Sequence, residues 1–214
     1  MLRGGAYKTR TSPRDFQGLG VPALKYLKEA STTYGLPSVT EITDFRDIPI
    51  IGKYADMIQI GARNMQNTAL LKAVGNSNNP VLLKRGFGNT VSELLAAADY
   101  ILAQGNQNVV LCERGIRTFE NSTRFSLDIL AIPVIKKLSH LPLIVDPSHA
   151  AGERDLVLSA SKAAIIAGAD GLLIEVACHP EVAQVDGNQT ISTEQFGDLM
   201  SQLRCIVPII GREI

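Results

Sequence analysis

One imidazole and two carboxylates follow apolar segments in the last third of the chain. His149 comes after the apolar run at 143–145, Glu175 ends the run at 172–174, and Asp186 lies in the next loop. Apolar runs that stop at ionisable side chains are typical of buried parallel strands whose carboxyl ends carry chemistry. Imidazole and carboxylate ligands suit Mn, Fe, Co or Zn, and three ligands leave room for substrate or water. We expect these three residues to bind a divalent metal ion, with Asp146 orienting the imidazole; a histidine satisfied within the core is the alternative.

A second group of side chains is cationic and also follows predicted strands. Guanidinium groups bind phosphate and carboxylate oxygens in pairs, and lysine adds a compact charge. Each residue alone is more simply a solvated surface cation, but their shared position favours a site for a substrate with both anionic groups. The group consists of Arg3, Lys8, Arg10, Arg63, Lys84, Arg85, Arg114 and Arg117.

Length and composition limit the classes of protein to which the chain can belong. A chain of 214 residues with 45% hydrophobic content is expected to form one domain over residues 1–214. Lys and Arg total 21, as do Asp and Glu, which argues against a nucleic-acid or anionic-membrane binder. Three widely spaced cysteines indicate no disulfide framework, and no apolar run approaches the ~20 residues of a membrane span. With no signal-peptide core at its start, the chain is predicted to be cytoplasmic.

Apolar strands alternate with amphipathic helices along the whole chain. Polar and glycine-rich residues follow each predicted strand, as in a barrel of parallel strands with its site at one face. A doubly wound sheet would also alternate, but no G-x-G-x-x-G follows the first strand. The prediction is an α/β fold of the (β/α)8 TIM-barrel type with seven of eight units. Strands are expected at 1–6, 37–42, 57–60, 80–83, 108–111, 143–145 and 171–176. Helices are expected at 21–33, 44–54, 66–74, 89–103, 127–138, 154–167 and 193–203.

Several motifs recur in the order of a known family. The first block runs from Leu2-Arg3-Gly4-Gly5 through Tyr7-Lys8-Thr9-Arg10-Thr11-Ser12-Pro13 to Phe16-Gln17-Gly18-Leu19-Gly20. The chain resembles the single-domain, type I beta synthases of 3-deoxy-D-arabino-heptulosonate 7-phosphate (DAHP), and the resemblance covers essentially its whole length. The later blocks are Gln59-Ile60-Gly61-Ala62-Arg63-Asn64, Pro80-Val81-Leu82-Leu83-Lys84-Arg85-Gly86, Cys112-Glu113-Arg114-Gly115, Val145-Asp146-Pro147-Ser148-His149 and Ile174-Glu175-Val176.

The resemblance implies an aldol-type transferase of aromatic amino acid biosynthesis. It would condense phosphoenolpyruvate with erythrose 4-phosphate and release phosphate, the first step of the shikimate pathway. By this likeness, His149, Glu175 and Asp186 would ligate the divalent metal ion, and Lys84 and His149 would be the catalytic residues, Lys84 as a proton donor. The phosphoenolpyruvate would be bound by Arg3, Arg63, Lys84 and Arg114. The tetrose phosphate would be bound by Lys8, Arg10, Thr11 and Ser12.

The sequence departs from the family pattern in three places. Thr9 stands where the family's Lys-Pro-Arg-Thr has a proline that would stiffen the loop. The usual histidine soon after Glu175 is displaced to His179, and the chain starts at Met1-Leu2-Arg3, without the family's preceding strand ending in Gly-Pro-Cys, whose cysteine is the fourth metal ligand. The sequence therefore predicts weak metal binding, little synthase activity in this chain and association into homo-oligomers through unpaired strand edges.

Two other functions are alternatives. The sister enzyme, 3-deoxy-D-manno-octulosonate 8-phosphate synthase, uses phosphoenolpyruvate with a pentose phosphate. The block Arg10-Thr11-Ser12 favours the tetrose enzyme, because the sister family usually has Lys-Ala-Asn-Arg-Ser there. The second alternative is an inactive binding or regulatory paralogue.

Overall fold

The chain folds into two compact units, seen in a computed structural model that describes residues 1–10 and 12–214. Unit 1 comprises Met1–Gly86 and Ser92–Leu111, and unit 2 comprises Phe87–Val91 and Cys112–Ile214. The main sheet has seven strands in chain order from β1 to β7, and the strand pairs with a described register are parallel. The prediction of an α/β fold with seven parallel strands is confirmed. No helix formed by residues 1–10 and 12–214 is long and apolar enough to cross a bilayer.

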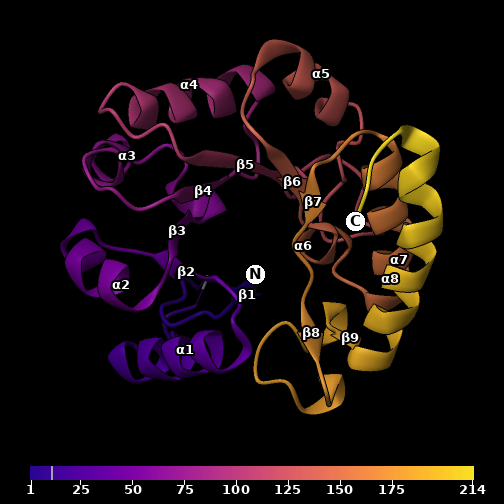
Figure 1. Cartoon of the computed structure of the whole chain (residues 1–214), viewed down its shortest axis with the longest axis horizontal. Helices are drawn as coiled ribbons and strands as arrows, with labels where there is room; N and C mark the ends of the chain where they lie inside the picture. Colours follow the sequence, from indigo (N-terminus) through magenta and orange to yellow (C-terminus); the bar gives the residue numbers. More distant parts are fainter. Residues whose placement is uncertain (11) are drawn as a thin grey trace. The chain divides into compact units, whose positions relative to one another are not determined.

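Unit 1 contains four strands and the first part of a fifth. Its helices α1, α2 and α3 lie along the same side of β1 to β4 (Figure 1). Strand residues such as Ile58 and Leu83 are fully buried, since parallel strands are covered by helices. Its elements are β1 (Leu2–Arg3), α1 (Val21–Tyr34), β2 (Ser38–Ile42), η1 (Phe45–Asp47), α2 (Ile48–Tyr54), β3 (Met57–Ile60), η2 (Ala62–Asn64), α3 (Thr68–Gly75), β4 (Val81–Lys84), α4 (Val91–Leu102) and the start of β5 (Val109–Glu113).

Unit 2 contains the end of β5, the last two strands of the main sheet and a separate two-stranded sheet. The last long helix begins with a capping box in which the Ser192 and Gln195 side chains bond to each other's backbone N–H groups. Its elements are α5 (Ala131–Leu138), β6 (Leu143–Val145), α6 (Pro147–Ala151), α7 (Arg154–Ile166), β7 (Gly171–Leu172), β8 (Val176–Ala177), η3 (Pro180–Val182), η4 (Gly187–Gln189), β9 (Ile191–Ser192), α8 (Thr193–Ile206) and η5 (Val207–Ile210).

Three sequence predictions about elements are wrong. The strand predicted at 171–176 ends at Leu172, and β8 pairs instead with β9. Residues 147–151, which we expected to be a loop, form α6. The strand predicted at 1–6 is shorter, since β1 covers only Leu2–Arg3.

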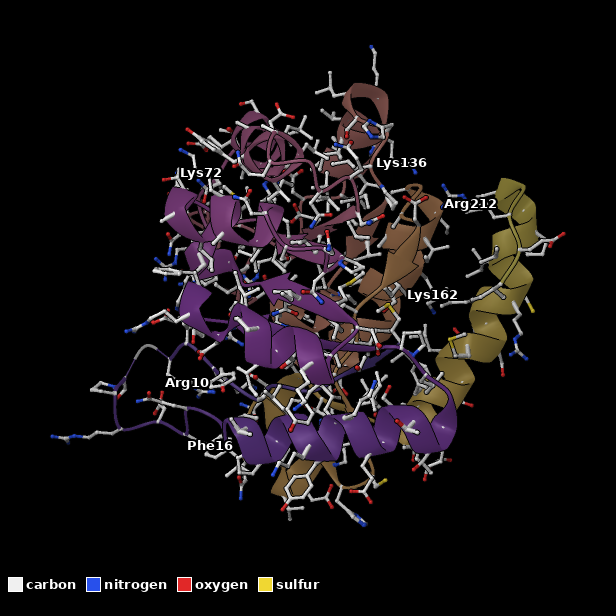
Figure 2. All side chains as sticks on the ribbon, turned by 60° about the vertical axis from the view of Figure 1, so that its left-hand side comes forward. Arg10, Phe16, Lys72, Lys136, Lys162 and Arg212 are labelled. Atoms are coloured by element: carbon white, nitrogen blue, oxygen red, sulfur yellow. The ribbon has the colours of Figure 1, made fainter. Side chains whose placement is uncertain are left out.

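The Asp170 carboxylate ties three parts of unit 2 together. It accepts the Leu143 N–H at 2.8 Å, and it contacts Lys136 Nζ at 2.7 Å and Arg212 Nη2 at 3.2 Å. Figure 2 labels both cationic partners, Lys136 and Arg212. Partial burial raises the pKa of Asp170, but the Leu143 hydrogen bond and the Lys136 contact outweigh it and hold the pKa below its usual range.

We expect Asp170→Asn to lower the free energy of unfolding by about 1 kcal/mol at pH 7, since its partners are partly exposed. The folded-state pKa is depressed, so this contribution is present above the unfolded pKa of about 4 and is lost as pH falls through the folded pKa. Urea unfolding at pH 7 and pH 3 measures this contribution to the free energy of unfolding. Asp198→Asn, at an exposed position of α8, is the control. An equal difference between Asp170→Asn and the parent protein at both pH values would contradict this account.

Candidate active site

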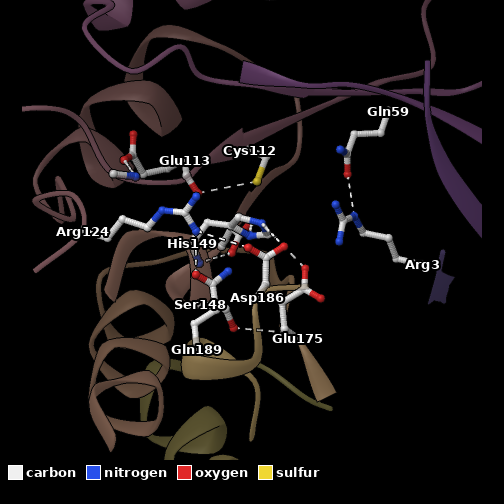
Figure 3. A network of polar contacts seen from close by, with 12 residues as sticks. Arg3, Gln59, Cys112, Glu113, Arg124, Ser148, His149, Glu175, Asp186 and Gln189 are labelled. Carbon is white, nitrogen blue, oxygen red and sulfur yellow. Dashed lines mark hydrogen bonds and ion pairs between the residues drawn. The ribbon is translucent and has the colours of Figure 1, made fainter. Parts of the chain in front are cut away.

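Unit 2 brings together the imidazole and both carboxylates that the sequence singles out (Figure 3). His149 Nε2 lies 3.8 Å from Glu175 Oε1 and 4.0 Å from Asp186 Oδ2. The three side chains are between 13% and 23% exposed, so each is largely shielded but reachable from solvent. One nitrogen of the ring is thus directed at two carboxylates.

Asp146 fixes the place of His149. It follows β6, and its Oδ1 accepts the His149 N–H at 2.9 Å, which caps α6. Its Oδ2 lies 2.7 Å from His149 Nδ1, as the sequence predicted for a residue that orients the ring. Asp146 is fully buried, and one carboxylate therefore both starts the helix and turns Nε2 toward Glu175 and Asp186.

A hydrogen bond to the side chain of Ser148, rather than pairing within the sheet, fixes the backbone position of Glu175. The sequence predicted a carboxylate near the end of a strand at 171–176, but β7 stops at Leu172 and Glu175 precedes β8. Its N–H donates to the hydroxyl of fully buried Ser148 at 3.1 Å. Because β6 gives way to α6 at Pro147, the α6 hydroxyl supplies the acceptor that a longer β6 would have offered.

Asp186 has a left-handed backbone conformation with φ of 57°, and it is the one non-glycine residue with positive φ among residues 1–10 and 12–214. Such a conformation costs about 1 kcal/mol or more and persists where the surroundings hold it. Arg124 Nη1 contacts Asp186 Oδ1 at 3.4 Å and donates to Gln189 Oε1 at 2.8 Å. The arginine thus holds both ends of the short segment that carries the Asp186 carboxylate.

The side chains of His149, Glu175 and Asp186 have the donor atoms that a divalent metal ion requires, but the distances between these atoms are longer than in a metal site. Within the described part of the chain, no group of three or more His, Cys, Asp or Glu side chains is arranged to hold a metal ion. Donors at about 2.1 Å from one ion lie about 3.0–3.4 Å apart, so the separations from His149 Nε2 are roughly half an ångström too long. The hard oxygens, the imidazole and its oriented Nε2 match the ligands that Mn, Fe, Co or Zn accept. Cys178, the nearest cysteine in sequence, is exposed.

Arg114 is a buried cation in unit 2. It is 3% exposed, and its guanidinium carbon lies 4.0 Å from the ring centre of Phe125 and 4.8 Å from that of Phe87. Burial, with a contribution from Arg124, lowers the pKa of Arg114 to about 10, so the group stays protonated at neutral pH. Its Nε and Nη1 have no hydrogen-bond partner among the residues described. A desolvated guanidinium with two such donors is suited to bind a carboxylate or phosphate.

The other predicted anion-binding residues belong to unit 1, at or just after the carboxyl end of a strand. Arg3 ends β1 and donates from Nε to Gln59 Oε1 at 2.9 Å. Lys84 ends β4 and is 4% exposed, and Arg63 lies on η2 after β3 and is exposed. The carboxyl ends of neighbouring parallel strands share one edge of a sheet.

The residues predicted to bind the tetrose phosphate lie on the loop between β1 and α1. Figure 2 labels Arg10 on this loop, and its Nε lies 3.5 Å from Asp15 Oδ2. Ser12 Oγ accepts the Arg14 N–H at 3.2 Å, and Lys8 N–H donates to the Gln17 carbonyl at 2.9 Å. Thr11 lies outside the described residues.

Sequence reasoning did not assign roles to several buried polar residues near these groups. Gln59 is 1% exposed, and fully buried Glu113 accepts the Gly115 N–H at 2.6 Å. The available signal was a polar residue within an apolar strand, since burying one without a partner is costly. Buried Ser148 and Gln189 also belong to this set, and the exposed Arg124, which contacts Gln189, was missed as well.

Comparisons with known proteins identify the family of the chain. A sequence model described as the DAHP synthetase I family matches residues 1–207. The phospho-2-dehydro-3-deoxyheptonate aldolase of Thermotoga maritima is 53% identical over 214 residues, which is all of this chain and 63% of the relative. A 2-dehydro-3-deoxyphosphooctonate aldolase of Geobacter sulfurreducens is 28% identical over 94% of this chain and 77% of its own length.

Solved structures show the same relation. The crystal structure of the Thermotoga maritima enzyme matches with a TM-score of 0.96 over 99% of this chain and 62% of that chain, at 53% identity. A truncated form of the Thermotoga synthase matches with a TM-score of 0.92 and 50% identity over 77% of its length. The chain thus spans less than two thirds of the full-length relative. It belongs to the DAHP synthetase I family.

Proposed function

We propose that the protein condenses phosphoenolpyruvate with erythrose 4-phosphate to give 3-deoxy-D-arabino-heptulosonate 7-phosphate and phosphate. The observation that carries this proposal is 53% identity along the entire chain with a phospho-2-dehydro-3-deoxyheptonate aldolase. The buried Arg114, with two available donors, and the His149 cluster are the chemical features that support it.

The proposed roles divide the residues between two substrates. Arg3, Arg63, Lys84 and Arg114 bind the carboxylate and phosphate of phosphoenolpyruvate, and Lys8, Arg10, Thr11 and Ser12 bind the aldose phosphate. Carbon 3 of phosphoenolpyruvate attacks the aldehyde carbon, water adds at carbon 2, and the phosphate leaves. The fixed cations stabilise the charge that develops on the departing phosphate, and Lys84 donates a proton to the forming alkoxide.

His149, Glu175 and Asp186 would hold a divalent ion, either Mn, Fe, Co or Zn. Such an ion polarises the aldehyde carbonyl when it is bound. Asp146 contacts Nδ1 of the imidazole and so turns Nε2 toward Glu175 and Asp186. Arg124 contacts the Asp186 carboxylate, and the Ser148 hydroxyl accepts the backbone N–H of Glu175.

A second candidate is the octulosonate reaction, because relatives named 2-dehydro-3-deoxyphosphooctonate aldolase match 94% of the chain at 28% identity. The two reactions share phosphoenolpyruvate and differ in the aldose phosphate. The higher identity to the heptonate enzyme favours the four-carbon sugar.

We expect phosphate release with erythrose 4-phosphate to exceed that with arabinose 5-phosphate by at least about tenfold, since productive contacts at both ends of the shorter sugar are worth roughly 1.4 kcal/mol or more. A phosphate-release assay with phosphoenolpyruvate, manganese and each aldose measures the preference. A reversed preference would assign the protein to the octulosonate reaction, and no turnover of either sugar would contradict both proposals.

The proposal extends to the setting of the enzyme. A balanced total of 21 basic and 21 acidic residues supports small-molecule substrates rather than a nucleic-acid or membrane partner. None of the three cysteines forms a disulfide, which supports the cytoplasm as the compartment. Association into homo-oligomers is part of the same proposal.

A further inference from the structure

Unit 1 contains a chain of polar contacts that begins at Arg3 and ends on the loop before α1. Arg3 Nε donates to Gln59 Oε1 at 2.9 Å, and Figure 3 shows this contact. Gln59 Nε2 donates to Glu41 Oε2 at 3.4 Å. The other oxygen of the same carboxylate, Oε1, accepts the hydroxyl of Thr9 at 3.3 Å. Four side chains therefore connect a strand-end arginine to the loop.

Strand register places Arg3, Gln59 and Glu41, the first three members of this series of contacts, on one face of the sheet. Glu41 of β2 pairs with Gln59 of β3 in the parallel ladder, so the two side chains point the same way. Arg3 of β1 pairs with Val39, which is two residues before Glu41 and shares its face. Three strands thus fix the positions from which these side chains reach each other.

The fold leaves space for the Glu41 carboxylate at one particular glycine. A Cβ atom on Gly61 would lie 1.9 Å from Glu41 Oε1, far inside van der Waals contact. The backbone of Gly61 has φ of −68°, which any residue adopts, so conformational freedom does not explain the glycine. The absent side chain is what allows Glu41 to stand between Gln59 and Thr9.

Thr9 lies between two cations of the loop that carries the proposed aldose-phosphate site. Backbone bonds from Lys8 N–H to the Gln17 carbonyl and from Gly20 N–H to the Ala6 carbonyl close the loop on itself. The Thr9 hydroxyl adds a side-chain bond from the loop to β2. Since Lys8 and Arg10 flank Thr9, this bond limits where both cations lie.

We propose that the Thr9 hydroxyl and the Glu41 carboxylate form a tether that sets the affinity of the loop for the aldose phosphate. Glu41 is a positioning residue, because it acts through Thr9 on one side and through Gln59 and Arg3 on the other. Thr9 determines affinity by ordering Lys8 and Arg10 and not by touching the sugar. The assignment of the loop to the aldose rests on the proposed function, whereas the tether itself does not.

The test compares three substitutions of Thr9. Thr9→Val keeps the β-branched shape and removes the hydroxyl, Thr9→Ser keeps the hydroxyl, and Thr9→Pro removes the hydroxyl but restrains the backbone. We expect Thr9→Val to raise the KM for erythrose 4-phosphate about three- to tenfold, the scale of one net hydrogen bond, with kcat and the Kd of phosphoenolpyruvate unchanged. Thr9→Ser and Thr9→Pro should stay near the parent value. Equal weakening by valine and proline would show that the hydroxyl binds the sugar directly and would overturn the ordering role.

Gly61→Ala tests the tether from the other side. The added methyl group displaces Glu41 and breaks both of its contacts, so this variant should weaken erythrose 4-phosphate and phosphoenolpyruvate together. Thr33→Val, an exposed threonine substitution on α1, is the matched control for the loss of a hydroxyl. A Gly61→Ala protein that binds both substrates as the parent does would contradict the role of Glu41.

Amide hydrogen exchange of residues 5–10 reports on the tether without any substrate. We expect faster exchange in Thr9→Val and Gly61→Ala, and parent-like exchange in Thr9→Ser and Thr33→Val. Unchanged exchange in Thr9→Val would show that the bond does not order the loop, and the inference would be wrong. Faster exchange together with no binding of either sugar phosphate by the parent protein would uphold the tether and reject the proposed function.

Discussion

Arg114→Met is expected to weaken phosphoenolpyruvate binding by about 30- to 1000-fold, because it removes one desolvated charge from the bound anion, at a cost of about 2–4 kcal/mol. The pKa of Arg114 is about 10, so the guanidinium is charged below about pH 9. Binding of phosphoenolpyruvate should fall as the pH rises through this pKa. Titration calorimetry with phosphoenolpyruvate at pH 7 measures the loss.

The same substitution is expected to lower the stability of the fold as well. The charge of Arg114 lies near the fully buried carboxylates of Asp146 and Glu113, and removing one partner of buried charges typically costs about 3–5 kcal/mol. Binding is therefore measured well below the Tm of the variant, at a temperature where a thermal melt shows it to be folded. Arg204→Ala, on the exposed face of α8, is the control for removing one positive charge. Parent-like binding by Arg114→Met would exclude Arg114 from the anion site.

His149→Ala is expected to lower the affinity for manganese by about 100-fold or more, since even partners behind a ligand are worth 10–100-fold. The imidazole is the residue that faces both carboxylates, at 3.8 and 4.0 Å. Without it, Glu175 and Asp186 are two like charges with no neutral ligand between them. Calorimetry with manganese alone gives the affinity without reference to turnover.

His140→Ala is the matched control for this substitution. His140 is exposed and lies in the turn before β6, the strand that leads to His149. It should leave manganese binding unchanged. A His149→Ala protein that binds manganese as tightly as His140→Ala would show that the ion is held elsewhere.

The sequence predicted the order and type of the main elements because apolar runs and helical periodicity dominate this chain. The sequence prediction placed the starts of two helices wrongly where a proline lies in the first turn. Pro49 and Pro133 fit within the first turn of a helix, so α2 begins at Ile48 and α5 at Ala131, each four residues later than predicted. Asp146 followed by Pro147 is the signal for α6 that was available and not used.

Other features depend on contacts between residues far apart in the chain. The segment around Glu175 leaves the sheet because the Glu175 N–H donates to the Ser148 hydroxyl instead of to a strand. No local sequence pattern predicts this hydrogen bond. The left-handed conformation of Asp186 is held by Arg124, which lies 62 residues earlier. The candidate residues of the site were identifiable by type and motif, whereas the residues that support them were not.

Asp146 makes two contacts that are usually supplied by different residues. Its carboxylate caps α6 through the His149 N–H and also holds the His149 ring. Substitutions at this position are therefore pleiotropic: a screen for expression and a screen for catalysis would both report damage at Asp146, and neither alone would say which contact had failed. Asparagine can still cap a helix but lacks the negative charge that faces Nδ1, so it is the substitution that separates the two readouts.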